Sequence, residues 1–184
     1  MCGGALVLTT SGVVAAGYRM IVTGSLTLDV GWGRTYRPLG PVLVQIAAPP
    51  DVVYNVVSEP YLGRTPRSLA SKLEVLEKGN DMVLAAHYTP TVAGLVAKTV
   101  ETVRFPTVDR IEFRLVRGPV PYVRETFVLH EVAGGTQLEY TGELRADFWA
   151  VGRWWGNQVA RKWEAAVVAS LASIKSEAER HAKR

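Results

Sequence analysis

The amino-acid sequence predicts a single α+β domain, in which a curved antiparallel sheet of about seven strands wraps around a long C-terminal helix. Three observations lead to this fold class. Six β-like runs follow one another from residue 73 to residue 144, with short turns between them. A long amphipathic pattern then covers residues 150–180. Finally, the chain of 184 residues is long enough for one well-packed core and short for two.

The first element of the predicted domain is a strand over residues 41–48, which a pair of prolines ends. A short helix is expected to begin at Pro50, because proline suits the first helical turn and Asp51 favours the positive end of the helix dipole. We expect this helix to stop before Pro60, with a loop or a broken second helix over residues 61–68. One face of the helix would be covered by Val52, Val53, Val56 and Val57.

Six further strands are expected, each ended by a glycine, a proline or a short polar turn. Strands joined by turns this short pair with their neighbours along the chain, so the six form an antiparallel meander. Their predicted ranges are 73–77, 82–89, 96–105, 111–116, 123–131 and 136–144.

The C-terminal helix is expected over residues 150–180. Its apolar side chains recur at steps of three and four residues, which gives an apolar stripe along one side of the helix. A half-wrapped sheet has one concave apolar face, and a single long helix can cover it. The predicted stripe consists of Trp155, Val159, Trp163, Val167, Leu171 and Ile174.

An apolar segment precedes the domain and carries no charge from Gly3 to Gly17. If it is helical to Val22, it spans about 30 Å, which is close to the hydrocarbon thickness of a bilayer. The first basic residues follow this stretch, so the positive-inside rule would place the globular domain in the cytoplasm. The sequence therefore predicts that residues 1–23 form a single-pass membrane anchor. Within this anchor, residues 3–22 would lie in the membrane. The alternative is a buried hairpin or a core helix.

Residues 24–40 are interpreted as a connecting segment. Apolar and polar residues alternate over 26–30, which favours a short strand or an interfacial segment. Trp32 and Tyr36 lie near arginines, as aromatic anchors at a membrane interface do. The folded domain is then expected over residues 41–184.

Composition excludes several classes of function. The net charge of +4 is mild and no basic run is interleaved with aromatic residues, so a nucleic-acid partner is not expected. The single cysteine, Cys2, cannot form an intramolecular disulfide, and with only three histidines the chain lacks a Cys/His metal pattern. The sequence also lacks a P-loop, a dinucleotide fingerprint and a nucleophile elbow. We expect no metal and no cofactor.

Three short stretches resemble a known family. They are Ile46-Ala-Ala-Pro-Pro-Asp-Val-Val-Tyr-Asn-Val-Val, Lys72-Leu-Glu-Val-Leu, and Gly135-Thr-Gln-Leu-Glu-Tyr before the long helix. Roughly residues 40–178 resemble the START-like (SRPBCC) superfamily, and more narrowly its polyketide cyclase/dehydrase-like members. The resemblance implies the helix-grip fold. It also implies a hydrophobic cavity between sheet and helix for lipids, sterols or polyketides, in proteins of which some are enzymes and many are not.

Strand alternation places Glu101 and Glu125 on the apolar side of their strands. Buried carboxylates are costly unless they are paired or hydrated, so both are candidates for polar anchors in an apolar pocket or for an acid/base pair. His87 on a neighbouring strand can join them, Trp155 is expected to line the core or cavity, and Tyr61 is expected at its rim. The alternative is a purely structural polar network. No residue is assigned a catalytic role.

These observations favour a membrane-tethered, cytoplasmic START-like domain that binds a hydrophobic ligand or acts as a non-catalytic module. The chain also resembles small accessory subunits of actinobacterial respiratory, oxidase-type membrane complexes, which implies protein partners in such a complex as one alternative. A polyketide cyclase-like enzyme that uses Glu101, Glu125 or His87 is the other.

Overall fold

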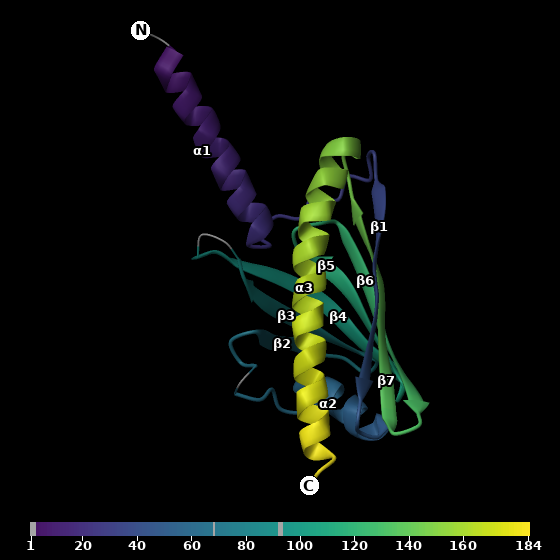
Figure 1. Ribbon diagram of the computed structural model, residues 1–184. Coiled ribbons are helices and arrows are strands. Elements are labelled where there is room, and N and C mark those ends of the chain that lie inside the picture. Colours follow the sequence, from purple (N-terminus) through teal and green to yellow (C-terminus); the bar gives the residue numbers. More distant parts are fainter. Residues whose placement is uncertain (1–2, 68, 92–93) are drawn as a thin grey trace.

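The computed structural model describes residues 3–67, 69–91 and 94–184, and it has the expected helix-grip architecture (Figure 1). One antiparallel sheet has the strand order β1-β7-β6-β5-β4-β3-β2. The described helices are α1 (Gly3–Val22), α2 (Pro50–Leu62) and α3 (Trp149–His181). The strands are β1 (Thr35–Ile46), β2 (Leu73–Lys78), β3 (Met82–Pro90), β4 (Val96–Thr107), β5 (Arg110–Arg117), β6 (Tyr122–Val132) and β7 (Gly135–Ala146).

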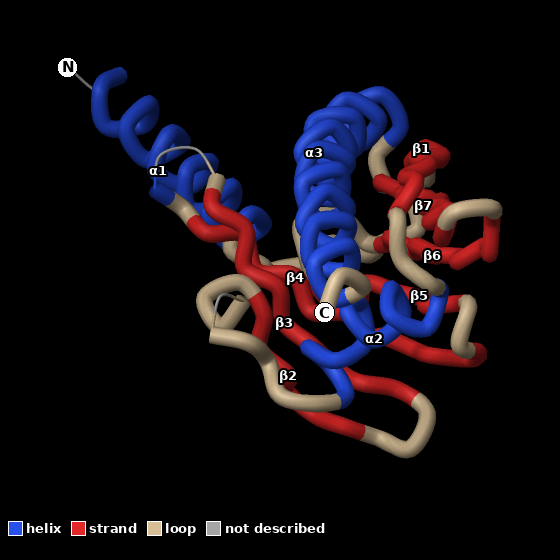
Figure 2. Tube along the Cα trace, turned by 60° about the horizontal axis from the view of Figure 1, so that its bottom comes forward, coloured by secondary structure: helices blue, strands red, loops and turns tan. Residues whose placement is uncertain are grey.

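Helix α3 lies inside the curve of the sheet, and Figure 2 shows the strands bending around it. It packs on β1, β7 and α2. The apolar stripe that the sequence predicts is the inner side of this helix, which closes the core over the concave face. Val159, Val167 and Leu171 are buried there, and Trp155, Trp163 and Ile174 pack against the core.

Helix α2 begins at Pro50 as expected but continues beyond Pro60 to Leu62. The predicted stop before Pro60 is therefore wrong. Proline lacks the backbone N–H that would donate within the helix, but its fixed φ is compatible with a helix. The last turn of a helix can therefore contain a proline when a following amide donates to that turn. The amide of Gly63 closes it by donating to the carbonyl oxygen of Glu59 at 2.8 Å.

Strand β1 begins at Thr35, earlier than the strand that the sequence predicts from residue 41. Gly40 makes the longer strand possible, because its φ of +75° lies in the left-handed region that glycine adopts without strain. The register against β7 shifts between Leu39 and Val42, as at a β-bulge. The sequence pattern therefore placed the start of this strand too late, at residue 41 instead of Thr35.

Residues 24–34, called the strap below, lie against the domain, and the short strand expected over 26–30 is not formed. The Thr27 hydroxyl donates to the carbonyl oxygen of Gly118 and accepts from the amide of the same residue, both at 2.9 Å. The carboxylate of Asp147, whose side chain is 1% exposed, forms an ion pair with Arg34 at 2.7 Å. These contacts fix the strap on the domain surface.

Helix α1 precedes the strap and extends away from the sheet (Figure 1). Its last residue, Val22, is buried, whereas Val13 and Val14 are exposed. The Tyr18 ring meets the Trp155 ring edge to face, with 6.1 Å between their centroids. Within the side chains that the structure describes, no helix has the length and apolarity needed to cross a membrane.

Candidate functional site

Both candidate glutamates lie on the concave face of the sheet, and their predicted inward orientation is confirmed by their burial. Glu101 is in β4 and Glu125 is in β6. Each pairs with a residue of β5, the strand between them: Glu101 with Leu115, and Glu125 with Phe113. Two strand spacings of about 4.8 Å across the sheet and two residues along β5 therefore separate their backbones. Their role in binding stays a prediction at this point.

Tyr61, His87 and Glu101 form one polar cluster, called the His87 group below. His87 Nδ1 lies 3.2 Å from Glu101 Oε2, and His87 Nε2 lies 3.0 Å from the Tyr61 hydroxyl. Among the described residues, Nδ1 makes no aligned hydrogen bond, so its contact with Glu101 is an ion pair without a directed bond. The His87 side chain is 24% exposed, which opens this group to solvent.

The sequence positions the members of the His87 group by simple periodicity. Tyr61 continues the buried side of α2 that Val53 and Val57 begin, at steps of four residues. His87 pairs with Thr99 on β4, and Glu101 lies two residues further along the same face of that strand. A helix end and two adjacent strands therefore bring the three side chains together.

Charge is stabilised within the His87 group in spite of its burial. Burial opposes ionisation of Glu101, but the facing imidazolium outweighs it, so the pKa of Glu101 is lowered. Burial likewise disfavours the charged form of His87, but the Glu101 carboxylate outweighs it and the pKa of His87 is raised. Burial raises the pKa of the Tyr61 phenol, which therefore stays neutral.

Glu125, Tyr140 and Trp163 form a second polar cluster, called the Glu125 group below. The Tyr140 hydroxyl and the Trp163 indole N–H both donate to Glu125 Oε1, each at 2.7 Å. Tyr140 lies on β7 beside Phe127 of β6, and Trp163 lies on the inner side of α3. Sequence analysis found Glu125 and placed Trp163 on the helix stripe, but it missed Tyr140. The inward position of Tyr140 between Leu138 and Leu144 was the available signal.

Burial is the largest cause that raises the pKa of Glu125 to about 7, and the negative charge of Glu101 acts in the same direction. The hydrogen bonds from Tyr140 and Trp163 oppose this rise by stabilising the carboxylate. At neutral pH the two glutamates therefore differ, because Glu101 is ionised while Glu125 is partly protonated. Such a difference between neighbouring carboxyl groups can serve acid and base roles in one site.

Aromatic rings connect the two polar groups across the concave face. The ring centroids are 5.9 Å apart for Tyr61 and Phe113, 5.3 Å for Phe113 and Phe127, and 5.4 Å for Phe127 and Tyr140. These are contact distances for aromatic pairs. Among the side chains described, no three His, Cys, Asp or Glu residues gather as a metal site. The site thus consists of two polar groups joined by an aromatic row.

Trp155 lies at a different place from these groups. Its indole N–H donates to the carbonyl oxygen of Pro119 at 2.8 Å, and its ring contacts Tyr18 of α1. The structure therefore brings Tyr61, His87 and Glu101 together, with Glu125 along the same face. Trp155 lies outside this cluster, and its predicted contact with a ligand stays a prediction.

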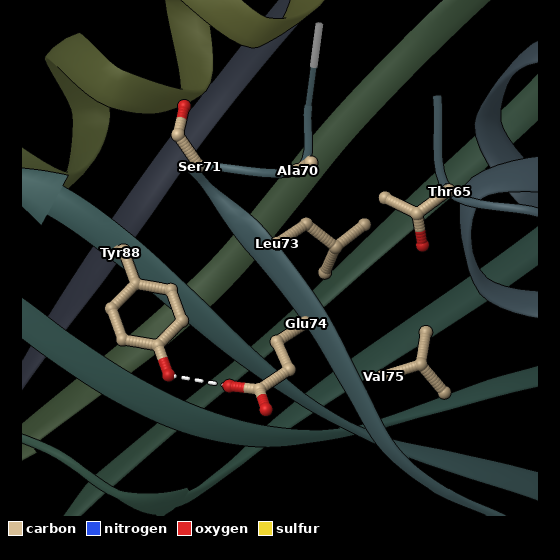
Figure 3. Close-up of a pocket in the computed structure, with 7 residues that line it drawn as sticks. All are labelled: Thr65, Ala70, Ser71, Leu73, Glu74, Val75 and Tyr88. Atoms are coloured by element: carbon tan, nitrogen blue, oxygen red, sulfur yellow. Dashed lines mark hydrogen bonds between the residues drawn. The ribbon is translucent and has the colours of Figure 1, made fainter. Parts of the chain in front are cut away.

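A hollow of about 520 Å³ lies at the β2 edge of the sheet, one strand away from His87 (Figure 3). Leu73, which pairs with His87 across β2 and β3, forms part of its wall. The Tyr88 hydroxyl donates to the Glu74 carboxylate at 2.6 Å beside it. The remaining lining residues are Thr65, Ala70, Ser71 and Val75. This edge provides a candidate entrance next to the solvent-exposed part of the His87 group.

We expect Tyr140→Phe to raise the pKa of Glu125 further, because the phenol hydrogen bond that favours the carboxylate is lost. The free energy of unfolding should fall by about 1.5 kcal/mol, the loss typical of one hydrogen bond to a charged group. Carboxyl titration by NMR and urea unfolding measure the two effects. Tyr88→Phe is the matched control, since its bond to Glu74 is exposed. Equal stability losses in both variants would contradict the special role of Tyr140.

Fold and site together define a START-like helix-grip domain with buried polar groups on an aromatic concave sheet. A family model described as polyketide cyclase / dehydrase and lipid transport matches residues 42–179, and the chain belongs to this family. Comparison with curated proteins gave no sequence match. The resemblance that the sequence motifs indicate is therefore confirmed at the level of the family.

Solved structures share the fold at low sequence identity. The Zhui aromatase/cyclase from Streptomyces sp. R1128 is 19% identical with a TM-score of 0.63, over 80% of this chain and 94% of that one. Norcoclaurine synthase from Thalictrum flavum, solved with dopamine and hydroxybenzaldehyde, is 14% identical with a TM-score of 0.61, over 79% and 87%. The di-domain aromatase/cyclase StfQ of steffimycin biosynthesis is 15% identical with a TM-score of 0.61, over 83% and 52%. The chain thus spans about half of StfQ.

Proposed function

We propose that the domain binds a hydrophobic small molecule, with its polar substituent held between the His87 group and the Glu125 group. The observation that carries this proposal is His87 Nδ1, a buried polar atom that faces Glu101 Oε2 at 3.2 Å but makes no aligned hydrogen bond among the described residues. A buried polar atom whose hydrogen-bonding capacity is not used is costly, and a ligand oxygen that accepts a hydrogen bond from it would reduce the cost.

The aromatic row indicates the chemical class of the ligand. A flat aromatic molecule with a hydroxyl or keto oxygen would pack against the aromatic row, in which Phe113 and Phe127 meet edge to face, and place its oxygen near His87. The family description, which covers polyketide cyclases, dehydrases and lipid transport, supports an apolar ligand of this kind. The hollow at the β2 edge, with Leu73 in its wall, would be the way in.

Binding is tested with a matched pair of probes, 1-naphthol and naphthalene, which differ by one hydroxyl. We expect both to raise the melting temperature of the delipidated protein, and 1-naphthol to bind about tenfold more tightly, the value of one good hydrogen bond. His87→Phe should abolish the preference for 1-naphthol. His130→Phe is the control, since His130 is exposed and pairs with Glu139. Absence of any shift, together with no ligand retained in native mass spectrometry, would overturn the proposal.

A polyketide cyclase-like enzyme is the second candidate, favoured by the difference in pKa between the two glutamates, which is lowered for Glu101 and raised for Glu125. Glu125, with a pKa raised to about 7, would donate a proton to a substrate oxygen, while the Glu101 carboxylate beside the His87 imidazolium would accept one. Glu125→Gln should then abolish turnover of an aromatic polyketide mimic while leaving its binding intact. Unchanged turnover would exclude this mechanism.

We further propose that α1 tethers the domain to a membrane. The support is the uncharged stretch from Gly3 to Gly17, together with the exposure of Val13 and Val14 on a helix that extends away from the sheet (Figure 1). The full chain should then stay in the membrane pellet after a carbonate wash, and release into the supernatant would contradict the tether.

Co-purification with stoichiometric membrane subunits would instead favour the accessory-subunit role.

A further inference from the structure

Exposed apolar side chains gather at the end of the domain where α3 begins. Trp32 is 63% exposed, Val151 is 70% exposed and Trp154 is 61% exposed. Leu28, Val30 and Trp149 are exposed in the same two segments, the strap and the first two turns of α3. Single exposed apolar residues are ordinary on a protein surface, but a contiguous group of this kind marks an interaction surface. We call these six residues the aromatic end.

The aromatic end is held in place by buried and backbone contacts. The rings of Trp32 and Trp149 meet edge to face, with 4.8 Å between their centroids. The Phe148 amide donates to the carbonyl oxygen of Trp32 at 2.7 Å, and the Trp149 amide donates to that of Gly33 at 2.8 Å. The ring of Trp149 lies so close to Gly33 that a Cβ there would come within 2.3 Å of it. The exposed rings are therefore displayed by a fixed scaffold.

The backbone at the start of α3 is strained in order to present these rings. Phe148 has a φ of +76° and Trp149 has a φ of +48°, a left-handed conformation that bulky side chains rarely adopt. Strain of this kind is retained where the surrounding structure enforces it, and it concentrates at functional sites. The amides of Val30 and Gly31 in the strap donate hydrogen bonds to the Asp147 carboxylate, and these bonds supply that enforcement.

Continuity with α1 indicates what covers the aromatic end. Trp154 lies 6.4 Å from Trp155, whose ring contacts Tyr18 of α1 at 6.1 Å, so the aromatic surface runs from α3 onto that helix. The start of α3 and the helix α1 lie toward the same end of the molecule in Figure 1. A bilayer that receives α1 would therefore be within reach of the exposed tryptophans, whose rings favour the interface between lipid and water.

The charges around the aromatic end match an anionic lipid surface. Residues 149–162 contain three basic side chains and no acidic one. Among the described residues, Arg153 makes no ion pair, so its charge is available to a phosphate. In the strap, Arg34 pairs with both the exposed Asp29 and the buried Asp147, so these three groups together carry one net negative charge, fewer than the positive charges of residues 149–162. Basic groups beside exposed apolar rings are typical of surfaces that bind anionic membranes.

We propose that the aromatic end lies directly on an anionic membrane, so that the folded domain itself contacts the bilayer in addition to α1. This inference rests on the proposed tether but makes a separate claim about the domain. The partner is the lipid surface itself, recognised through tryptophan insertion and arginine–phosphate contacts.

Quenching of tryptophan fluorescence by brominated lipids tests the docking with the full chain reconstituted in vesicles. All five tryptophans lie outside α1, so the signal reports the domain and not the tether. We expect quenching in vesicles of phosphatidylcholine mixed with phosphatidylglycerol, and markedly less in phosphatidylcholine alone or at high salt. Membrane-bound protein without quenching would overturn the docking while leaving the tether intact, and protein that fails to bind vesicles would overturn both.

Substitutions at the most exposed positions locate the contact. Val151→Glu and Arg153→Glu should each reduce quenching severalfold, because a carboxylate at the interface is repelled by anionic lipid. Val108→Glu is the matched control, since Val108 is equally exposed but lies in the turn between β4 and β5. Thermal unfolding confirms that the variants are folded. Equal quenching in all three variants, or protection of the tryptophans by a co-purifying membrane protein, would exclude lipid as the partner.

Discussion

Asp147→Ala is expected to lower the free energy of unfolding by about 3–5 kcal/mol, the cost typical of breaking a buried ion pair by removing one partner. The Asp147 carboxylate is buried and accepts from the amides of Val30 and Gly31 at 2.8 and 2.7 Å, and from Arg34 Nε at 2.7 Å. Removing it leaves three donors without their acceptor. Because these donors fix the strap, we also expect the amides of Val30 and Gly31 to lose hydrogen-exchange protection.

Asp29→Asn is the control for this prediction, because Asp29 also pairs with Arg34 but is exposed. An exposed ion pair contributes little, so the change should stay below about 1 kcal/mol. The Arg34 hydrogen bond is the largest cause that lowers the pKa of Asp147, to about 2. The ionised Asp147 therefore stabilises the fold fully above pH 3.8, the ordinary pKa of an aspartate, and this contribution is lost as the pH falls toward 2. A loss of less than about 1 kcal/mol in Asp147→Ala would contradict a structural role for the strap.

Glu125→Gln is expected to make the protein more stable than the wild type above pH 7, with little difference near pH 4. In the folded state the pKa of Glu125 is raised to about 7 from its ordinary value of 4.5, first by burial and then by Glu101. Between these values the folded state binds more protons than the unfolded state. The wild type therefore loses stability as the pH rises through this window, and the loss is complete above the folded pKa.

The gap between the two pKa values corresponds to a free energy on the order of 3 kcal/mol. Glutamine keeps an oxygen that can accept from Tyr140 and Trp163, so the variant removes the charge while preserving the hydrogen bonds. Urea unfolding of both proteins from pH 4 to pH 8 measures the difference. Glu131→Gln, an exposed position on the same strand, should change stability by less than about 0.5 kcal/mol throughout. Parallel curves for wild type and Glu125→Gln would show that Glu125 ionises normally.

Local patterns predicted the parts of this fold that depend on one segment at a time. The alternation of side chains in β4 and β6 was sufficient to place Glu101 and Glu125 on the concave face. Helix periodicity was sufficient to find the inner side of α3. Local patterns failed at the boundaries, where Pro60 stays inside α2 and β1 continues through Gly40, because neighbouring groups there supply hydrogen bonds and a bulge that the local sequence does not announce.

Sequence alone therefore determined the class of the domain, its family resemblance and the candidates His87, Glu101 and Glu125. Only the tertiary structure decided how those residues are partnered. Tyr140 and Trp163 meet Glu125 across separations of 15 and 38 residues, and Asp147 holds Val30 across 117. The physical reason is that such hydrogen bonds depend on where whole strands and helices pack, whereas a periodic pattern reports only which side of its own element a residue occupies.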